Sequence, residues 1–315
     1  MGEGGTPITM EVLQHPADRK ALAALKKVKG LDFLTRKAIE WGIEGRIRRE
    51  LLANCLRVGE RQCPSLHELY VDCASSLGVE EPPELFVECN PYPVSYIVGV
   101  SKAMIVLSTG LVDVMEEDEV RFALGHELGH FLCQHVLYQT MVRYISEIVA
   151  RLGDVISVAG PLGGMTKVAV KPIEVALLSW SRVSEFSADR AGLIACRDLD
   201  TALSALVKLG IPSRKLWGEV DVGELVRQAE ELELEIEEGV EEFEEPPEPE
   251  GRLAKVRKGL AKVKEKVKGL AGKWSRASIG TRTQPWPILR VRELVMWAGS
   301  EEYEGLLRWA RGQSS

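Results

Sequence analysis

The five residues from His126 to His130 have the order His-Glu-Leu-Gly-His, and their types and spacing suit a metal site with a general base. Four residues of α-helix rotate a side chain by about 400°, so the two imidazoles differ by only about 40° in direction and can bind one metal ion. Neutral imidazole is a common ligand of zinc. Glu127 stands between the two histidines and can accept a proton from a water molecule at the metal. The motif therefore predicts metal-assisted hydrolysis with Glu127 as the general base.

A third ligand has to come from another part of the chain. An extended form of the motif would place a glycine at 133 and a histidine at 136, but these positions hold Cys133 and Val136. His135 lies about half a turn from His126 around the helix, so we expect it to point away from the metal. We interpret Cys133 as a small buried side chain rather than a ligand.

Glu185 and Asp189 form a second pair with a spacing of four residues. With His126 and His130, Glu185 would complete three protein ligands and leave the fourth tetrahedral position to water, which is the arrangement of a catalytic zinc site. Asp189 can accept the remaining N–H of one imidazole and so orient it. Alone, the pair would be interpreted as a solvated acidic face. Together with the two histidines it predicts one Zn²⁺ ion per chain.

Two long helices are expected to carry these residues. One should extend from Val120 to about Val136, after an acidic run at 116–119 whose charge is favourable at a helix N-terminus. The other should extend from Pro172 to Cys196. Gly125 and Gly129 weaken a helix interior by about 1 kcal/mol each relative to alanine, so we expect another backbone to pack closely against them.

The remaining pattern predicts helices around a small sheet. Apolar residues recur at helical spacing over 16–78, with Asp18 or Asp32 as candidate N-caps. Two short strands, at 96–98 and 104–107, are expected on either side of a turn. The fold class is therefore α+β and mainly α, with a small sheet and an active-site helix pair.

Composition excludes several classes of protein. The net charge of −7 gives no basic surface for nucleic acid. We expect no secretory signal at the N-terminus. The longest uncharged apolar stretch, 155–166, has 12 residues, whereas a transmembrane helix needs about 20. The six cysteines lack a C-x-x-C pair and fit reduced thiols, so we expect a cytoplasmic protein.

Together, these motifs resemble the HtpX-like and CaaX-prenyl-endopeptidase family of zinc metallopeptidases, which are of the gluzincin type. The resemblance covers most of the chain. The segments that carry it are 105–111, the acidic entry 117–119, the motif 126–130, Glu185 with 188–189, and 283–291 near the C-terminus. It implies that His126, His130 and Glu185 bind zinc, that Glu127 is the general base and that Asp189 supports a ligand.

The resemblance also implies how substrate is held. An extended peptide would pair with an edge strand made of Ser95, Tyr96, Ile97 and Val98. The family strand usually begins Asn-Ala-aromatic, where this chain has Val94, Ser95 and Tyr96. The family's C-terminal segment usually has His-Pro, where this chain has Gln284 and Pro285.

The segment between the second histidine and the distal glutamate distinguishes this chain within the family. Members of the membrane branch insert transmembrane helices between the second histidine and the distal glutamate, whereas residues 137–171 here are interrupted by charges, so we expect a soluble branch. Arg182, Tyr96 and Gln284 are candidate donors to an oxyanion. Arg182 can equally be the partner of a structural ion pair.

By this resemblance the chain divides into four segments. We expect a helical N-terminal layer (1–80), a zinc metallopeptidase core (81–222), an exposed acidic linker with a basic amphipathic helix (223–272), and a C-terminal helical segment that packs on the core (273–315). Because like charges repel, we expect the acidic linker, 224–250, to be mobile.

We therefore expect a zinc-dependent metalloendopeptidase that hydrolyses peptide bonds of unfolded or extended polypeptides. One alternative is a zinc-containing binding or chaperone-like module without peptidase activity. Another is peripheral membrane contact through residues 155–165 and a basic helix at 252–273.

Overall fold

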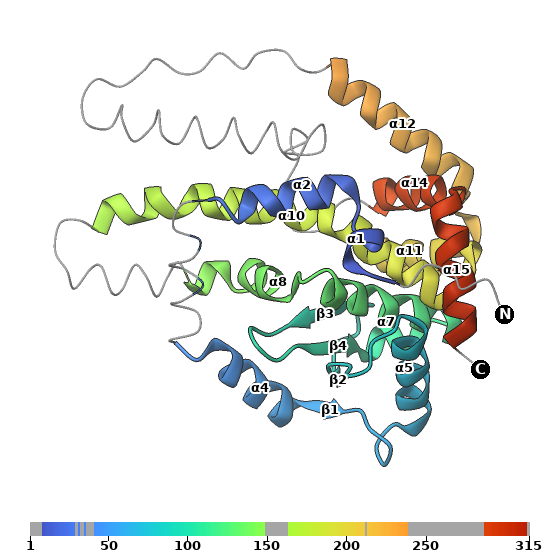
Figure 1. Cartoon of the computed structure of the whole chain (residues 1–315), viewed down its shortest axis with the longest axis horizontal. Helices are drawn as coiled ribbons and strands as arrows, with labels where there is room; N and C mark the ends of the chain where they lie inside the picture. The colour runs from blue at the N-terminus through green and yellow to red at the C-terminus, as the bar shows by residue number, and fades with distance from the viewer. Residues whose placement is uncertain are drawn as a thin grey trace.

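The structure is a computed structural model that describes residues 8–28, 31, 35, 41–148, 163–211, 213–238 and 287–313. Figure 1 shows its helices and strands in chain order. The elements are α1 (Met10–Leu13), α2 (Pro16–Leu25), α4 (Ile43–Asn54), β1 (Cys55–Arg57), α5 (Pro64–Ser76), β2 (Glu84–Glu88), β3 (Ser95–Val98), β4 (Met104–Ser108), α6 (Thr109–Val114), α7 (Glu117–Leu132), α8 (Val136–Arg143), α10 (Gly163–Cys196), α11 (Leu199–Gly210), the short η1 (Trp217–Glu219), α12 (Val222–Glu238), α14 (Pro287–Ala298) and α15 (Glu301–Gln313).

A four-stranded mixed sheet lies beside the helices in the order β1-β2-β4-β3. Strands β3 and β4 form the expected antiparallel hairpin, with Ser95 opposite Leu107. Strand β2 pairs with β4 in parallel, and β1 pairs with β2 in antiparallel fashion. The pattern of apolar residues did not predict β1 or β2. The expected fold class, α+β and mainly α with a small sheet, is confirmed.

Helices α7 and α10 pack against each other through small residues. A Cβ atom added to Gly125 would lie 2.4 Å from Cβ of Ala195, and one added to Gly129 would lie 2.7 Å from Cβ of Ala191. Only glycine allows the two backbones to approach this closely, which is the close packing that the sequence predicted. The helix pair therefore has a fixed spacing where its functional residues lie.

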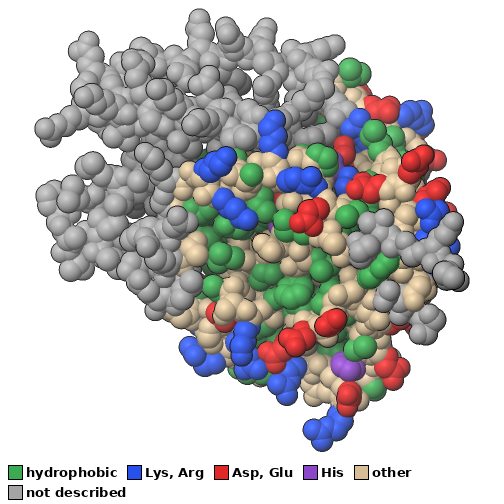
Figure 2. Space-filling view, viewed as in Figure 1, with side chains coloured by type: hydrophobic (Ala, Val, Ile, Leu, Met, Phe, Trp, Pro, Cys, Tyr) green, Lys and Arg blue, Asp and Glu red, His purple; other side chains and the backbone are tan. Residues whose placement is uncertain are grey.

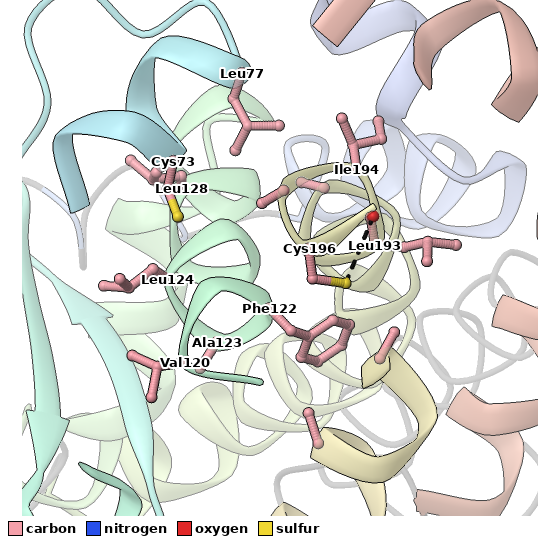
Figure 3. Close-up of a cluster of buried hydrophobic side chains, with 14 of the residues drawn as sticks. Cys73, Leu77, Val120, Phe122, Ala123, Leu124, Leu128, Leu193, Ile194 and Cys196 are labelled. Atoms are coloured by element: carbon pink, nitrogen blue, oxygen red, sulfur yellow. Dashed lines mark hydrogen bonds between the residues drawn. The ribbon is translucent and has the colours of Figure 1, made fainter. Parts of the chain in front are cut away.

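The hydrophobic core surrounds this helix pair. Figure 3 shows part of it, where α5, α7 and α10 meet. Phe122, Leu124 and Leu128 from α7 are fully buried there, as are Leu193 and Ile194 from α10. A second apolar cluster joins α2, α4 and α8 to the sheet and to the middle of α10. Because both clusters include residues of α10, this helix is packed into the core from Ile173 to Cys196.

The structure corrects three expectations about local structure. The motif helix ends at Leu132 rather than near Val136, because Gln134 has a positive φ of 60° and interrupts the helix before α8. Asp18 is not an N-cap: His15 caps α2 by accepting from the N–H of Ala17, whereas Asp18 lies inside the helix and is fully buried.

The third correction concerns the acidic segment. Residues 222–238 form helix α12, which lies against α14 and buries Ala229 completely, so this part is not a mobile linker. A helical pattern of apolar side chains outweighs the repulsion between its glutamates. Residues 239–286 lie outside the described residues, and so do Asp32 and the apolar stretch before Gly163. The division into four segments stays a prediction.

Within the described part of the chain, none of the helices combines the length and the apolar character that crossing a bilayer would require.

Candidate metal centre

His126, His130 and Glu185 come together where α7 crosses α10. All three side chains are buried, and their ligand atoms lie within 4.8 Å of one another. Oε2 of Glu185 lies 3.5 Å from Nε2 of His126, and Oε1 of the same carboxylate lies 3.4 Å from Nε2 of His130. The helical spacing of the two histidines and the helix crossing thus place three donors around one point.

The geometry of these donors fits a small divalent cation. Two ligands at about 2.0–2.1 Å from a tetrahedral zinc ion are about 3.3–3.4 Å apart. The two distances from the Glu185 carboxylate to the imidazole nitrogens match this separation closely. Among the described residues this is the one group of three or more potential ligands that meets such a distance criterion.

Charges around the cluster favour a cation at the same point. Burial works against the charge of Glu185, but hydrogen bonds from both histidines hold its pKa well below the usual range. Burial likewise disfavours charge on His126, yet Asp189 and Glu185 raise its pKa to about 10. Burial lowers the pKa of His130 to about 4. The site thus combines the anionic carboxylate of Glu185, the neutral imidazole of His130 and, at His126, surroundings that favour positive charge. A metal ion can supply this charge in place of the proton on His126.

Asp189 supports His126 as the sequence predicted, but it does so with a partner that sequence reasoning missed. Its Oδ1 lies 2.9 Å from Nδ1 of His126. Arg290, from α14, donates to both carboxylate oxygens of Asp189, at 2.8 and 2.5 Å. A further nitrogen of Arg290 lies 3.4 Å from Glu185. The segment around Arg290 was part of the family resemblance, and this was the available signal for its role.

Glu127 points into the same site from the α7 side. Its side chain is buried, and its Oε1 accepts a hydrogen bond of 2.5 Å from the hydroxyl of Ser95 on β3. Burial raises the pKa of Glu127 to about 6. A carboxylate with such a pKa can accept a proton near neutral pH. The contact with Ser95 was not predicted, because it joins residues of different elements.

A cavity opens beside these groups, and residues of the predicted substrate strand line one side of it. It is lined by Ser95, Tyr96 and Ile97 of β3, by His126, Glu127 and His130 of α7, by Gln139, Val142 and Arg143 of α8, and by Ser181 and Glu185 of α10. The volume of the cavity is about 120 Å³. Because β3 is the last strand of the sheet, one of its edges faces away from β4. In Figure 2, apolar side chains gather in the middle of the face, near the place of β3 and α8 in Figure 1, and charged side chains surround them.

Of the three candidate oxyanion donors, the structure places Tyr96 in the lining of this cavity. Arg182 is half-buried on α10 and is not part of the cavity lining. Gln284 lies outside the described residues. Val98, the last residue of the predicted substrate strand, is fully buried in the second apolar cluster and does not line the cavity.

His135 is also closer to the site than the sequence indicated. It points away from the metal position, as expected, but its Nδ1 lies 3.0 Å from Nδ1 of His130. The break in the helix at Gln134 turns His135 back toward His130, and helical spacing alone gave no sign of this. Cys133 is buried and burial raises its pKa, which fits a structural thiol.

The fold and this site define a metallopeptidase, in which two histidines and a glutamate from crossing helices surround a metal position next to a buried glutamate. The chain belongs to peptidase family M48, whose model matches residues 60–294. This confirms the resemblance to the HtpX-like and CaaX-prenyl-endopeptidase family. No solved structure gives a significant match to the chain.

Several metallopeptidases are similar in sequence. The plastoglobule-localized metallopeptidase 48 of Arabidopsis thaliana, a chloroplast protein by its name, is 25% identical over 304 residues, which is 96% of this chain and 76% of the relative. A protease HtpX homolog of Ralstonia nicotianae is 24% identical over 50% of this chain and 62% of its own length. One from Persephonella marina is 21% identical over 49% and 59%. The chain thus spans about three-fifths of the HtpX homologs that it matches.

Proposed function

We propose that this protein is a zinc-dependent metalloendopeptidase that hydrolyses peptide bonds of unfolded or extended polypeptides. His126, His130 and Glu185 would hold one Zn²⁺ ion per chain, and Glu127 would be the general base. The observation that carries the proposal is the set of three buried donors whose ligand atoms lie within 4.8 Å of one another, with the Glu127 carboxylate in the same cavity. The cytoplasm is the proposed location, on the grounds of the cysteine pattern.

The residues of the site divide the work of hydrolysis. When bound, zinc supplies a Lewis acid that polarises the peptide carbonyl and makes water easier to deprotonate. Glu127 accepts the proton of the attacking water and then passes it to the nitrogen of the leaving amine. Because the side chain of Glu127 is largely shielded from bulk solvent, its proton is delivered to the substrate rather than lost to solvent. Asp189 and Arg290 keep the His126 ring in position.

Strand β3 supports the proposal of an extended substrate. An edge strand can bind a peptide by main-chain hydrogen bonds, which recognise any sequence in extended form. Ser95, Tyr96 and Ile97 line the cavity together with Glu127, so a peptide added to this edge would pass the general base. A folded protein has few extended segments free for such pairing, and for this reason unfolded chains are the proposed substrates.

The substitution Glu127→Gln tests the mechanism because it preserves the shape of the side chain and removes the base. The variant should bind about one zinc per chain and lose activity on an unfolded protein by about 10²–10⁴-fold. Zinc content is measured by metal analysis, and cleavage by the release of peptides. His126→Ala should lose the tightly bound zinc. The matched control is Glu117→Gln, an exposed glutamate of the same helix, which should keep full activity.

The possible results separate peptidase from binding module. Cleavage at the wild-type rate by the Glu127→Gln protein would reject Glu127 as the base. A wild-type protein that holds zinc and yet cleaves no unfolded protein would support the binding or chaperone-like module instead.

A further inference from the structure

A buried chain of polar groups leads from His130 away from the metal position to the N-terminal helix α2. Nδ1 of His130 lies 3.0 Å from Nδ1 of His135. Nε2 of His135 lies 3.0 Å from Oδ2 of Asp18. The side chains of His135 and Asp18 are both completely buried. The end of α7, the start of α8 and helix α2 are therefore joined by one continuous chain of close polar contacts.

With a metal ion bound, the contacts select which nitrogen of each ring carries a proton. Nε2 of His130 faces Glu185 and the metal position, so when Nε2 binds the metal the proton of the ring lies on Nδ1, which can donate. Its neighbour, Nδ1 of His135, must then be unprotonated and accept. The proton of a neutral His135 consequently lies on Nε2, which faces Oδ2 of Asp18 at 3.0 Å, although the ring is not aligned for a full hydrogen bond. A carboxylate at Asp18 favours this arrangement because its negative charge attracts the N–H and repels a nitrogen lone pair.

Asp18 is held firmly in this role. Its Oδ1 accepts from the indole N–H of Trp180 at 3.0 Å, and its Oδ2 accepts from the hydroxyl of Ser187 at 2.6 Å. Both donors belong to α10, the helix that also carries Glu185, and α2 packs along α10 in Figure 1. Burial works against its charge, but His135 and Ser187 keep the pKa of Asp18 below its usual value.

We propose that Asp18 is a positioning residue of the metal centre, which acts through His135 to fix the tautomer and orientation of His130. Helix α2 is then a functional part of the site, although it lies before the residues that match the family model. The proposal rests on the proposed function only in that His130 binds the metal. Outer partners of metal-bound histidines typically change metal affinity by about 10–100-fold.

The test measures zinc affinity of the full-length protein rather than peptidase activity. Zinc dissociation constants are determined by competition with a chromogenic chelator for wild type, Asp18→Asn, His135→Leu and the double variant. Asp18→Asn should weaken zinc binding by about 10-fold or more, and His135→Leu by at least as much. Because Asp18 acts through His135, the double variant should bind zinc no more weakly than His135→Leu alone.

The matched control is Glu119→Gln, which makes the same change from carboxylate to amide in another buried network of α7. Glu119 accepts from Ser204 at 2.6 Å and from Lys208 at 2.5 Å, and none of the three belongs to the ligand group or to the cavity lining. This variant should lose stability to urea while its zinc dissociation constant stays within about 2-fold of wild type. A second readout is the tautomer of His135 by long-range ¹H–¹⁵N NMR, which should show a proton on Nε2 in wild type.

The proposal is overturned if Asp18→Asn binds zinc as tightly as wild type, or if the effects of the two single substitutions multiply in the double variant. Should Asp18→Asn not fold, His135→Asn replaces it: its amide can still accept from His130 but is too short to reach Asp18, and an unchanged zinc affinity there would also overturn the proposal. Equal zinc binding by wild type and His126→Ala would instead reject the metal site itself.

Discussion

Arg290 donates two hydrogen bonds to the carboxylate of Asp189, from Nε at 2.8 Å and from Nη2 at 2.5 Å. The same carboxylate contacts Nδ1 of His126. Arg290 and Asp189 are both buried, so each charge depends on the other for compensation. Helix α14 is thereby attached to the ligand helices α7 and α10. The C-terminal part of the chain contributes to the metal centre through this contact.

This pairing predicts two separate effects of losing Asp189. Asp189→Ala should weaken zinc binding by about 10–100-fold, because His126 loses its acceptor. It should also lower the free energy of unfolding by up to about 3–5 kcal/mol, because Arg290 remains buried and keeps only the carboxylate of Glu185, at 3.4 Å, as a counter-charge. The second effect was not expected from sequence, which gave Asp189 no partner other than the histidine.

The two effects can be measured apart. The double variant Asp189→Ala/Arg290→Met removes both charges, so urea unfolding in EDTA should show that stability is regained in part, while zinc affinity stays low. Full recovery of zinc affinity in the double variant would contradict the role of Asp189 as an acceptor for His126.

The close contact of α7 and α10 predicts that alanine, although a better helix former than glycine, will destabilise the protein at this contact. Alanine at Gly129 should lower the free energy of unfolding by about 1–3 kcal/mol, because the new Cβ meets Ala191. Gly45 of α4 is the control: its added Cβ would find only an ordinary contact at 3.6 Å, so alanine should stabilise by about 0.5–1 kcal/mol. Equal gains at both positions in urea unfolding would show that the helices can separate without cost.

Much of the metal centre was predictable because its spacing is local. His126 with His130, and Glu185 with Asp189, are each four residues apart on one helix, and the helical repeat places such pairs on one face. The hairpin of β3 and β4 was predictable for a similar reason, since two apolar runs flank a short turn.

The rest depended on contacts that no spacing encodes. Asp18, Arg290 and Ser95 reach the site from α2, α14 and β3, and their contacts follow from how these elements pack. Asp18 was interpreted as a helix cap because a local role was the simplest reading of an aspartate near a helix start. The end of α7 was missed because the helix breaks at Gln134, where the sequence has neither a glycine nor a proline to indicate a break.

Glu44 predicts a pH-dependent contribution to the hairpin that carries β3. Its carboxylate accepts from the backbone N–H groups of Val100, Ser101 and Lys102, at 2.6, 2.5 and 2.9 Å. Burial would raise its pKa, but these backbone donors lower it below the usual value. A lowered pKa in the folded state means that the stabilisation is complete above the unfolded pKa of about 4.3 and is lost as the pH falls through the folded pKa.

Glu44→Gln should therefore lower the free energy of unfolding by about 1–2 kcal/mol at pH 7, and the difference from wild type should shrink below about pH 4. Urea unfolding in EDTA at both pH values measures this. Glu50→Gln, at an exposed position of the same helix, should match wild type at each pH. A difference at pH 7 that persists undiminished at low pH would assign the effect to shape rather than charge.

The cavity also predicts a preference for the charge of the substrate. Arg143 is the one lysine or arginine among the described residues that line it, and its guanidinium lies 3.4 Å from the ring centroid of Tyr96. The stacking holds this cation at the wall formed by β3, where an extended peptide would lie. A peptide with an acidic side chain at this wall should be cleaved faster than one with the corresponding amide, by about 2–5-fold in kcat/KM, the size expected of an exposed charge pair.

Matched peptides with Glu or Gln at each position around the cleaved bond would measure this preference in wild type, Arg143→Lys and Arg143→Gln. Arg143→Lys keeps the charge and should retain the preference, whereas Arg143→Gln should lose it. Added salt should reduce the wild-type preference, because salt screens the attraction between exposed charges, with a screening length of about 10 Å at 0.1 M. A preference for Glu that survives in Arg143→Gln at low salt would show that another group recognises the substrate charge.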